Sequence, residues 1–288
     1  MKTIKYTLTL ISLLCSMVLL GQGVEKEQLT VALSNPGKPY KLVVGLLSGS
    51  IRVTGHSADN LIINVEVEED RKSKKSDPKV SGLKRIGASS GYEIDAVEKN
   101  NEVTINNHSM MRKIDLDIKV PLNGTLVLNT LNEGDIVVSN IKGELELNNV
   151  NGDIKVSGFS GTAVANTVNG DISVAFSSVT EGKPMAFSTF NGDVNLNFPA
   201  TTKANLKMKT DQGEIFSDFE VAIDKSSAAP VKTNSGGTYK ISKDAWVTGK
   251  INGGGAELMV KSWSGDLFIQ KQIGYTQQTY SSIYCCKQ

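Results

Sequence analysis

A glycine recurs at a nearly constant interval through the middle of this 288-residue chain, and that period limits the possible folds more than any other feature. Six glycines follow at spacings of ten, nine, nine, nine and nine residues: Gly124, Gly134, Gly143, Gly152, Gly161 and Gly170. Alternate glycines carry nearly the same motif: Glu133-Gly134-Asp135-Ile136, Asn151-Gly152-Asp153-Ile154, Asn169-Gly170-Asp171-Ile172 and Asn191-Gly192-Asp193-Val194. Weaker copies stand at Ser48-Gly49-Ser50-Ile51, Gln212-Gly213-Glu214-Ile215 and Ser264-Gly265-Asp266-Leu267. Such self-similarity at a short period indicates a repeat architecture.

The residues after each glycine alternate between apolar and polar. After Gly152, Ile154 and Val156 are apolar, whereas Lys155 and Ser157 are polar. Strict alternation predicts a strand with one buried and one solvated face, and β-branched residues suit the buried face. The Asn-Gly pair favours a tight corner, because both residues tolerate positive φ. Each unit of about nine residues is therefore predicted to hold one strand and one corner.

Two arrangements of these units are possible. Asn-Gly also marks two-residue hairpins, so the alternative is an antiparallel meander folded into a sandwich or barrel. Stacking is favoured because the same apolar residue type returns at every second unit, which places like on like in coils about 4.8 Å apart. The sequence therefore predicts an all-β fold, a single-stranded β-solenoid with short strand-corner units over residues 121–271 and about six to ten coils in all.

The N-terminus has the features of a signal peptide over residues 1–22. Lys2 and Lys5 are followed by an apolar run from Leu8 to Leu20, and small residues stand near the expected cleavage point. The run is too short to span a bilayer comfortably, so no transmembrane span is expected in the mature chain. A lipid anchor at Cys15 is disfavoured because Leu14 precedes it, where a small residue is usual. The protein is expected to be exported, to the periplasm or the cell surface.

The segments on either side of the repeats are less regular. Residues 23–120 are β-rich without a clear period, and we expect either a cap of the solenoid or irregular early coils, since open sheet edges need protection. Glu69 to Lys84 is charged and turn-rich, which predicts a solvated loop, with a basic docking patch as the alternative. Residues 272–288 form a C-terminal tail. Its adjacent Cys285 and Cys286 are poorly placed for a mutual disulfide, so the tail is either loose or bridged between molecules.

Taken together, these segments resemble a known family. The signal sequence, the β-rich lead-in ending in Asp117-Ile118-Lys119-Val120-Pro121, and the serial Asn-Gly-Asp-Ile-x-Val units resemble the DUF4097 group of bacterial adhesin-like proteins. The resemblance covers nearly all of the mature chain, from Val31 to Lys271, and the cleavage region is similar to that of Bacteroidota. It implies a β-solenoid, an envelope location and a role in adhesion. It carries no catalytic or binding residues onto this chain.

Signs of catalysis or cofactor binding are scarce. The chain has only two histidines, His56 and His108, and neither stands near cysteines or carboxylates in a ligand-like pattern. There is no phosphate-binding loop. A net charge of +1 and an aromatic content of 6% argue against a nucleic acid partner. We therefore expect no enzymatic activity and no cofactor.

One constellation could carry chemistry, namely the aspartates of the repeat: Asp135, Asp153, Asp171 and Asp193. If the coils stack, these carboxylates form a column and repel one another by about 1 kcal/mol per neighbouring pair in water. Bound Ca²⁺ would relieve the repulsion, because Ca²⁺ takes several oxygen ligands. The favoured interpretation is structural, with each carboxylate accepting backbone N–H groups at its corner. The repeat lacks the paired glycines of the calcium-binding nonapeptide. The neighbouring asparagines are expected to form a corner amide ladder.

These features predict a structural or adhesin-like module that binds an envelope protein or glycan through an extended β face. An envelope scaffold or sensor-associated protein is the first alternative, and it shares every sequence feature. The second alternative is a polysaccharide-processing β-helix, whose paired carboxylates would lie about 5–10 Å apart. The scarcity of aromatic residues on the predicted outer faces argues against it.

Overall fold

The structure is a computed structural model, and it describes residues 24–68, 92–108, 112–224, 231–235, 238–242 and 246–272. In these residues every helix or strand is a β-strand, so the all-β prediction is confirmed. The expected signal peptide, the charged segment from Glu69 to Lys84 and the tail beyond Gln272, with Cys285 and Cys286, lie outside the described residues.

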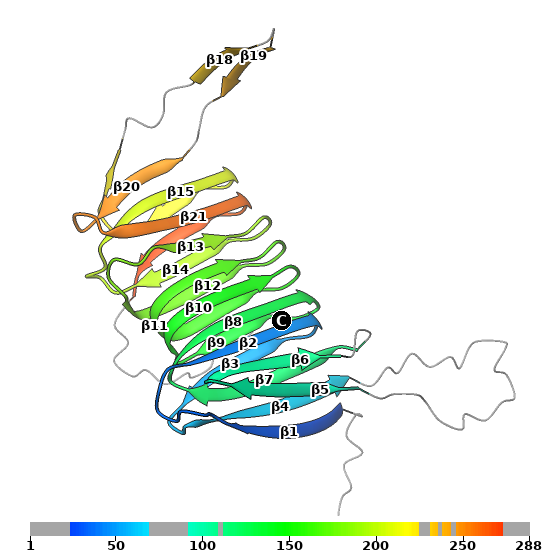
Figure 1. The fold of residues 1–288 in the computed structure, drawn as a ribbon. Coiled ribbons are helices and arrows are strands. Elements are labelled where there is room, and N and C mark those ends of the chain that lie inside the picture. Colours follow the sequence, from blue (N-terminus) through cyan, green and yellow to red (C-terminus); the bar gives the residue numbers. More distant parts are fainter. Residues whose placement is uncertain are drawn as a thin grey trace, which may run out of the picture.

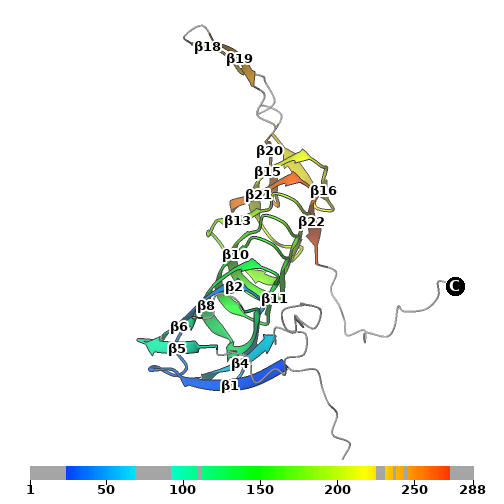
Figure 2. The ribbon, with the colours of Figure 1, turned by 90° about the vertical axis from the view of Figure 1, so that its right-hand side faces the viewer.

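The strands form two rows that run along the molecule, and successive coils of chain contribute to both (Figures 1 and 2). Row A contains, in spatial order, β5 (Ile94–Lys99), β6 (Glu102–Asn107), β2 (Tyr40–Ser48), β8 (Asn123–Asn132), β10 (Lys142–Asn149), the second half of β11 (Ile154–Asn166), β13 (Met185–Ser188), β21 (Ala256–Ser264), β15 (Ala204–Gln212), β20 (Val247–Ile251) and β17 (Val221–Ile223).

Row B contains β1 (Val24–Ala32), β4 (Asn60–Glu68), β7 (Ile114–Pro121), β3 (Ile51–His56), β9 (Ile136–Ser139), the first half of β11, β12 (Ile172–Val179), β14 (Val194–Phe198), β22 (Leu267–Lys271) and β16 (Ile215–Ser217). A separate hairpin is formed by β18 (Val231–Ser235) and β19 (Thr238–Ser242). Because β11 belongs to both rows, the 20 strands of the two rows make one continuous sheet.

In the middle of the molecule the pairing is parallel and follows the sequence repeat. Ile154 lies opposite Ile136 on one side and Ile172 on the other, which are the corresponding residues of the preceding and following motifs. In row A, Gly143 pairs with Gly161, two glycines that are separated by the same interval in sequence. One coil of this section therefore contributes a strand segment to each row, an arrangement that is β-solenoid-like.

The alternating apolar residues fill the space between the rows. Ile154 and Ile172, for example, are fully buried in row B, and Leu147 is fully buried in row A. A column of aromatic rings closes the corner where the chain returns from row B to row A. The ring centroids of Phe159 and Phe176 lie 5.5 Å apart, and those of Phe176 and Phe198 lie 4.6 Å apart in a stacked arrangement. Their burial removes large apolar areas from water, which is the main stabilising contribution in a fold of this kind.

The N-terminal part is divided between the stack and a cap. β2 and β3 pair in parallel with β8 and β9, so they form a coil of the stack, and the early motif at Gly49 lies directly beside Gly134. β4 pairs antiparallel with β7, and β1 pairs antiparallel with β4, which closes this end of row B. Strand pairing therefore crosses the expected domain boundary at residue 120, and the boundary itself stays a prediction.

At the other end the repeats do not stack in chain order. β21 and β22 lie between β13 and β14 on one side and β15 and β16 on the other. The coil formed by residues 256–271 is thus inserted between two coils that precede it in the sequence (Figure 1). Beyond it, β20 pairs antiparallel with β15 and with β17. The parallel stack therefore ends in antiparallel strands in row A.

Candidate functional site

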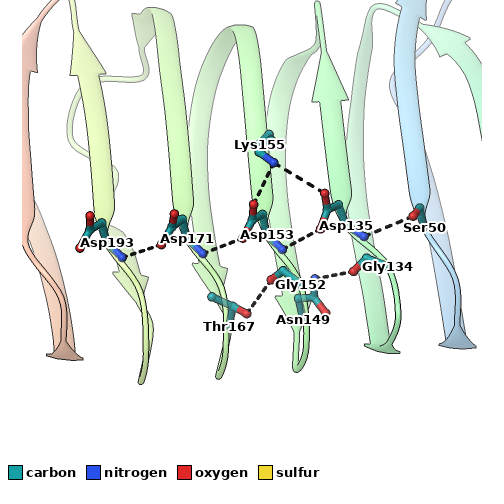
Figure 3. A network of polar contacts seen from close by, with 10 residues as sticks. All are labelled: Ser50, Gly134, Asp135, Asn149, Gly152, Asp153, Lys155, Thr167, Asp171 and Asp193. Atoms are coloured by element: carbon teal, nitrogen blue, oxygen red, sulfur yellow. Dashed lines mark hydrogen bonds and ion pairs between the residues drawn. The ribbon is translucent and has the colours of Figure 1, made fainter. Parts of the chain in front are cut away.

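The four aspartates of the repeat lie in one line along row B, each just after its Asn-Gly or Glu-Gly corner (Figure 3). The Oδ1 atom of Asp135 accepts the backbone N–H of Asp153 at 2.9 Å, and Asp153 accepts that of Asp171 at 2.9 Å. Asp171 accepts the N–H of Asp193 at 2.8 Å. Each carboxylate therefore joins its own coil to the next one. We call this line the acidic ladder.

The ladder continues beyond the four predicted aspartates. Asp193 accepts the N–H of Asp266 at 2.7 Å, and Asp266 accepts that of Glu214 at 2.8 Å, following the spatial order of the coils. At the other end the Ser50 hydroxyl accepts the N–H of Asp135 at 3.3 Å, and Asp115 accepts the N–H of Ser50 at 2.7 Å. Weaker copies of the motif mark Ser50, Glu214 and Asp266 in the sequence. Asp115 is not part of a copy of the motif, so it was not predicted from the sequence.

One cation offsets part of the negative charge. The Lys155 ammonium lies 2.8 Å from Oδ2 of Asp153 and 3.6 Å from Oδ2 of Asp135. Partial burial acts to raise the pKa of Asp153, but the hydrogen bonds from Lys155 and from the Asp171 backbone outweigh it, so this pKa lies below its ordinary value. The hydrogen bond to Asp153, opposed by partial burial, and the charges of Asp153 and Asp135 raise the pKa of Lys155 above its ordinary value. The ionised form of the Asp153 carboxylate is thus favoured.

The geometry of the acidic ladder is that of a line and not of a cage. In each of Asp135, Asp153 and Asp171 one oxygen is engaged with the backbone of the next coil. Within the described part of the chain, no group of three or more His, Cys, Asp and Glu residues is arranged to hold a metal ion. Calcium would normally require six to eight oxygen ligands around one point. Calcium binding by Asp135, Asp153, Asp171 and Asp193 therefore stays a sequence-based hypothesis.

A second ladder, which was not predicted from the sequence, lies inside the same corner. The Thr167 hydroxyl donates to the Gly152 carbonyl at 3.0 Å, and a Thr, Asn or Ser occupies the same place in other coils (Figure 3). The members are Thr130, Asn149, Thr167, Thr189, Ser262 and Thr210. Most stand three residues before the motif glycine, a signal that the sequence contains. Only Asn149 has a buried side-chain atom without a partner among the described residues, its Oδ1.

Amide ladders also run along the outside of the stack, as predicted for the asparagines of the motif. The Asn169 amide donates to Asn151 at 2.9 Å, and the Asn191 amide donates to Asn169 at 2.8 Å. Asn151 in turn donates to Asn132 at 2.9 Å. A parallel ladder on row A joins four further residues: Asn129, Asn148, Asn166 and Ser188. The polar side chains at the corner therefore bond chiefly to one another.

The two histidines take no part in these ladders. His56 Nε2 lies 2.8 Å from the Asn60 carbonyl, and His108 Nε2 lies 2.8 Å from Oδ1 of Asp95. Neither pair includes a serine or cysteine nucleophile.

Among the described residues, no helix is long and apolar enough to cross a membrane.

Comparison with solved structures finds similar chains at low sequence identity. One is a candidate cell adhesion protein from Clostridium sporogenes ATCC 15579, with 11% identity over 87% of this chain and 100% of that chain and a TM-score of 0.42. Another is a candidate adhesin from Bacteroides fragilis NCTC 9343, with 11% identity over 87% of this chain and 98% of that chain and a TM-score of 0.39.

No curated protein matches the sequence. A family model does, and it covers the chain from β2 to β20 but not β1 of the cap or the inserted coil of β21 and β22. The matching model is DUF4097, described as Toastrack, and it spans residues 41–252, well over half of the chain. The expected family resemblance is thereby confirmed: this protein belongs to the DUF4097, or Toastrack, family.

Proposed function

We propose that the protein is an exported, non-enzymatic module of the bacterial envelope that binds a protein or glycan partner through the outer surface of row B. Its building block is the short strand-corner unit, two of which complete a coil. The proposed location, in the periplasm or at the cell surface, is supported by the signal-like features of residues 1–22. An envelope scaffold or sensor-associated role is the alternative, and it would use the same surface.

The observation that supports this function best is the regular outer surface of row B, which we call the flat face. Side chains from successive coils lie in register there, and most are small: Ser139, Ser157, Ser173, Ala175, Asn195 and Asn197. The stacked rings of Phe216 and Phe268, with centroids 5.2 Å apart, lie at its C-terminal end. Small side chains at a constant spacing leave a surface without deep relief. An extended partner could contact several coils of it at once.

The properties of the acidic ladder argue against the polysaccharide-processing alternative. Glycosidases of the usual kind need one carboxyl group with a raised pKa, which acts as the general acid. The pKa of Asp153 is lowered instead, and its Oδ1 is engaged with the Asp171 backbone. The Asp153 carboxylate is therefore better suited to holding coils together than to protonating a leaving group.

The test is binding of the purified protein to intact bacteria and to a panel of envelope glycans. A flat-face variant, Ser157→Glu with Asn195→Glu, is compared with Thr125→Glu, which places a charge on row A. We expect saturable binding by the wild type and the control, and at least a tenfold loss in the flat-face variant at an unchanged melting temperature. Absence of saturable binding by the wild type, or release of shortened glycans, would contradict the proposal.

A further inference from the structure

Six apolar side chains form a continuous column along the corner between the rows, which we call the corner ridge. Its members are Leu47, Leu131, Val150, Val168, Phe190 and Trp263. Each stands directly before an Asn or Ser at its corner. These following residues pair in parallel from coil to coil, except Asn132 and Asn151, which are joined by a side-chain hydrogen bond at 2.9 Å. Five of the six are exposed by 40–49%. The rings of Phe190 and Trp263 stack with a centroid distance of 5.8 Å and an interplanar angle of 3°.

Exposure on this scale requires an explanation. Soluble monomers rarely expose contiguous apolar patches larger than a few hundred Å² unless the patch is an interaction site. The ridge is not needed for the core, because the inward-facing residues of the same strands are separately buried. A shallow depression at its N-terminal end is lined by Leu47, Leu131 and polar residues of the same corner. The ridge lies at the corner where the chain passes from row A to row B.

The residues directly beside the ridge are uncharged over four coils, whereas Glu133 lines the depression at its N-terminal end and the aspartates of the acidic ladder follow three or four residues after the ridge residues. On the row A side lie Asn129, Asn148, Asn166 and Ser188, and on the other side lie Asn132, Asn151, Asn169 and Asn191. Within each ladder the side chains already bond to one another, for example Asn169 to Asn151 at 2.9 Å. Polar groups with internal partners lose less free energy when water is removed from around them. The flanks can therefore enter a partly apolar environment at a small penalty.

Lysines gather at the Trp263 end of the ridge. Lys261 on β21 lies directly opposite Lys209 on β15, and Lys207 follows on the same strand. Lys250 on β20 pairs with Asn205 beside them. Among the described residues, only Lys209 of these four has an ion-pair partner, Asp211 at 3.6 Å. Like charges that face each other across strands are destabilising. An anionic partner would reduce the repulsion between these lysines.

We propose that the corner ridge docks onto the surface of an anionic lipid bilayer, with Phe190 and Trp263 in the headgroup region and the four lysines against the anionic headgroups. Exposed aromatic residues beside lysines suit a membrane interface, where the rings and the lysine stems meet apolar surface while the charges stay in water. The positive cluster complements the negative charge of such a surface. A glycan would need free polar groups, which the laddered amides do not supply.

Binding to vesicles tests the proposal. The chain has two tryptophans, so Trp246→Phe leaves Trp263 as the only tryptophan reporter. With phosphatidylglycerol-containing vesicles we expect cosedimentation and a blue shift of Trp263 fluorescence, both weakened by salt. With pure phosphatidylcholine vesicles we expect neither. Phe190→Ser with Trp263→Ser should abolish binding in a cosedimentation assay.

Charge variants separate the lysine cluster from net charge. Replacing Lys207 and Lys261 by Gln should weaken binding about fivefold per lysine. The matched control, Lys38→Gln with Lys142→Gln, removes the same charge from exposed positions outside the cluster and should bind like the wild type. Melting temperatures verify that all variants fold. The proposal is overturned if anionic vesicles are not bound, if the control loses as much affinity as the cluster variant, or if Trp263 is covered by self-association instead. The flat-face variant should still bind vesicles, which distinguishes failure here from failure of the proposed adhesive function.

Discussion

The replacement Gly192→Ala is expected to destabilise the stack severely, because the motif glycines touch one another across coils. A Cβ at Gly192 would lie 2.1 Å from the Gly170 carbonyl oxygen, far inside the 3.4 Å at which ordinary contact begins, and the local φ is +147°. Separating these two coils would break the bonds from Gly170 N–H to the Asn191 carbonyl at 2.9 Å and from Asn191 N–H to the Val168 carbonyl at 2.8 Å. Two hydrogen bonds at about 1 kcal/mol each, with about 1–2 kcal/mol for the positive φ, give about 3–4 kcal/mol.

The matched control is Gly45→Ala, in a strand of the same stack. A Cβ at Gly45 meets nothing within 4 Å, and its φ is not positive, so a small gain in stability is expected. At about 2–4 °C per kcal/mol for a chain of this size, Gly192→Ala should lower the melting temperature by about 10 °C, as measured by circular dichroism. If both variants melt within about 2 °C of the wild type, the close packing of glycine on glycine is wrong.

Four further outcomes follow from the same structure. Ile172→Asp places a charge in the fully buried column and should abolish cooperative melting; an unchanged melting curve would contradict the register. Asn149→Thr removes the buried, unpartnered Oδ1 and copies the residue found in neighbouring coils, so urea unfolding should show a gain of about 1 kcal/mol, and a loss would count against the inner ladder. The lowered pKa of Asp153 means that its stabilising contribution is complete above its ordinary value of 3.8 and is lost as pH falls below that value. As pH falls, the melting temperature of the wild type should therefore decrease more steeply than that of Asp153→Asn. Parallel decreases in the two proteins would contradict a stabilising role of the Asp153 carboxylate. Adding Ca²⁺ or EDTA should leave the melting temperature unchanged if the acidic ladder is structural, whereas a large rise with Ca²⁺ would show a metal site.

Much of the fold could be predicted because the stack repeats the same local interactions. The glycines recur because glycines of neighbouring coils are in contact, and the alternation at Ile154 and Val156 arises because these side chains are buried. Both patterns can therefore be recognised in the sequence. The order of the coils is different. The motif at Gly265 resembles its neighbours, and nothing in a copy of a motif says which other copy it lies beside. The insertion of residues 256–271 depends on pairing across long separations, which local sequence does not encode. The position of the coil formed by β2 and β3 also depends on pairing across long sequence separations, so it could not be predicted either.

The acidic ladder was visible in part, since its aspartates share a motif. Its donors were not, because each N–H comes from the next coil and therefore depends on the stacking itself. Asp115 joins the ladder through Ser50 although it belongs to no repeat. The corner ridge was not predicted, because Phe190 and Trp263 lie at corners, where the alternation of apolar and polar residues ends. The strand period therefore gives no prediction of their exposure. Exposure there depends on the path of the chain around the corner.

The inserted coil also constrains the order in which the chain can fold. A repeat protein can usually grow by adding each new unit to the end of the stack already formed. Here growth in chain order can reach β14, but β15 and β16 cannot join the stack at that stage, since the strands that connect them to β13 and β14 belong to residues 256–271. Folding of the stack can be completed only after residues 256–271 have been synthesised and have paired with β13 and β14. Contacts of such long sequence separation are slow to form. Until then the edges of β13 and β14 stay unpaired, and a chaperone or a neighbouring unfinished chain could reach them.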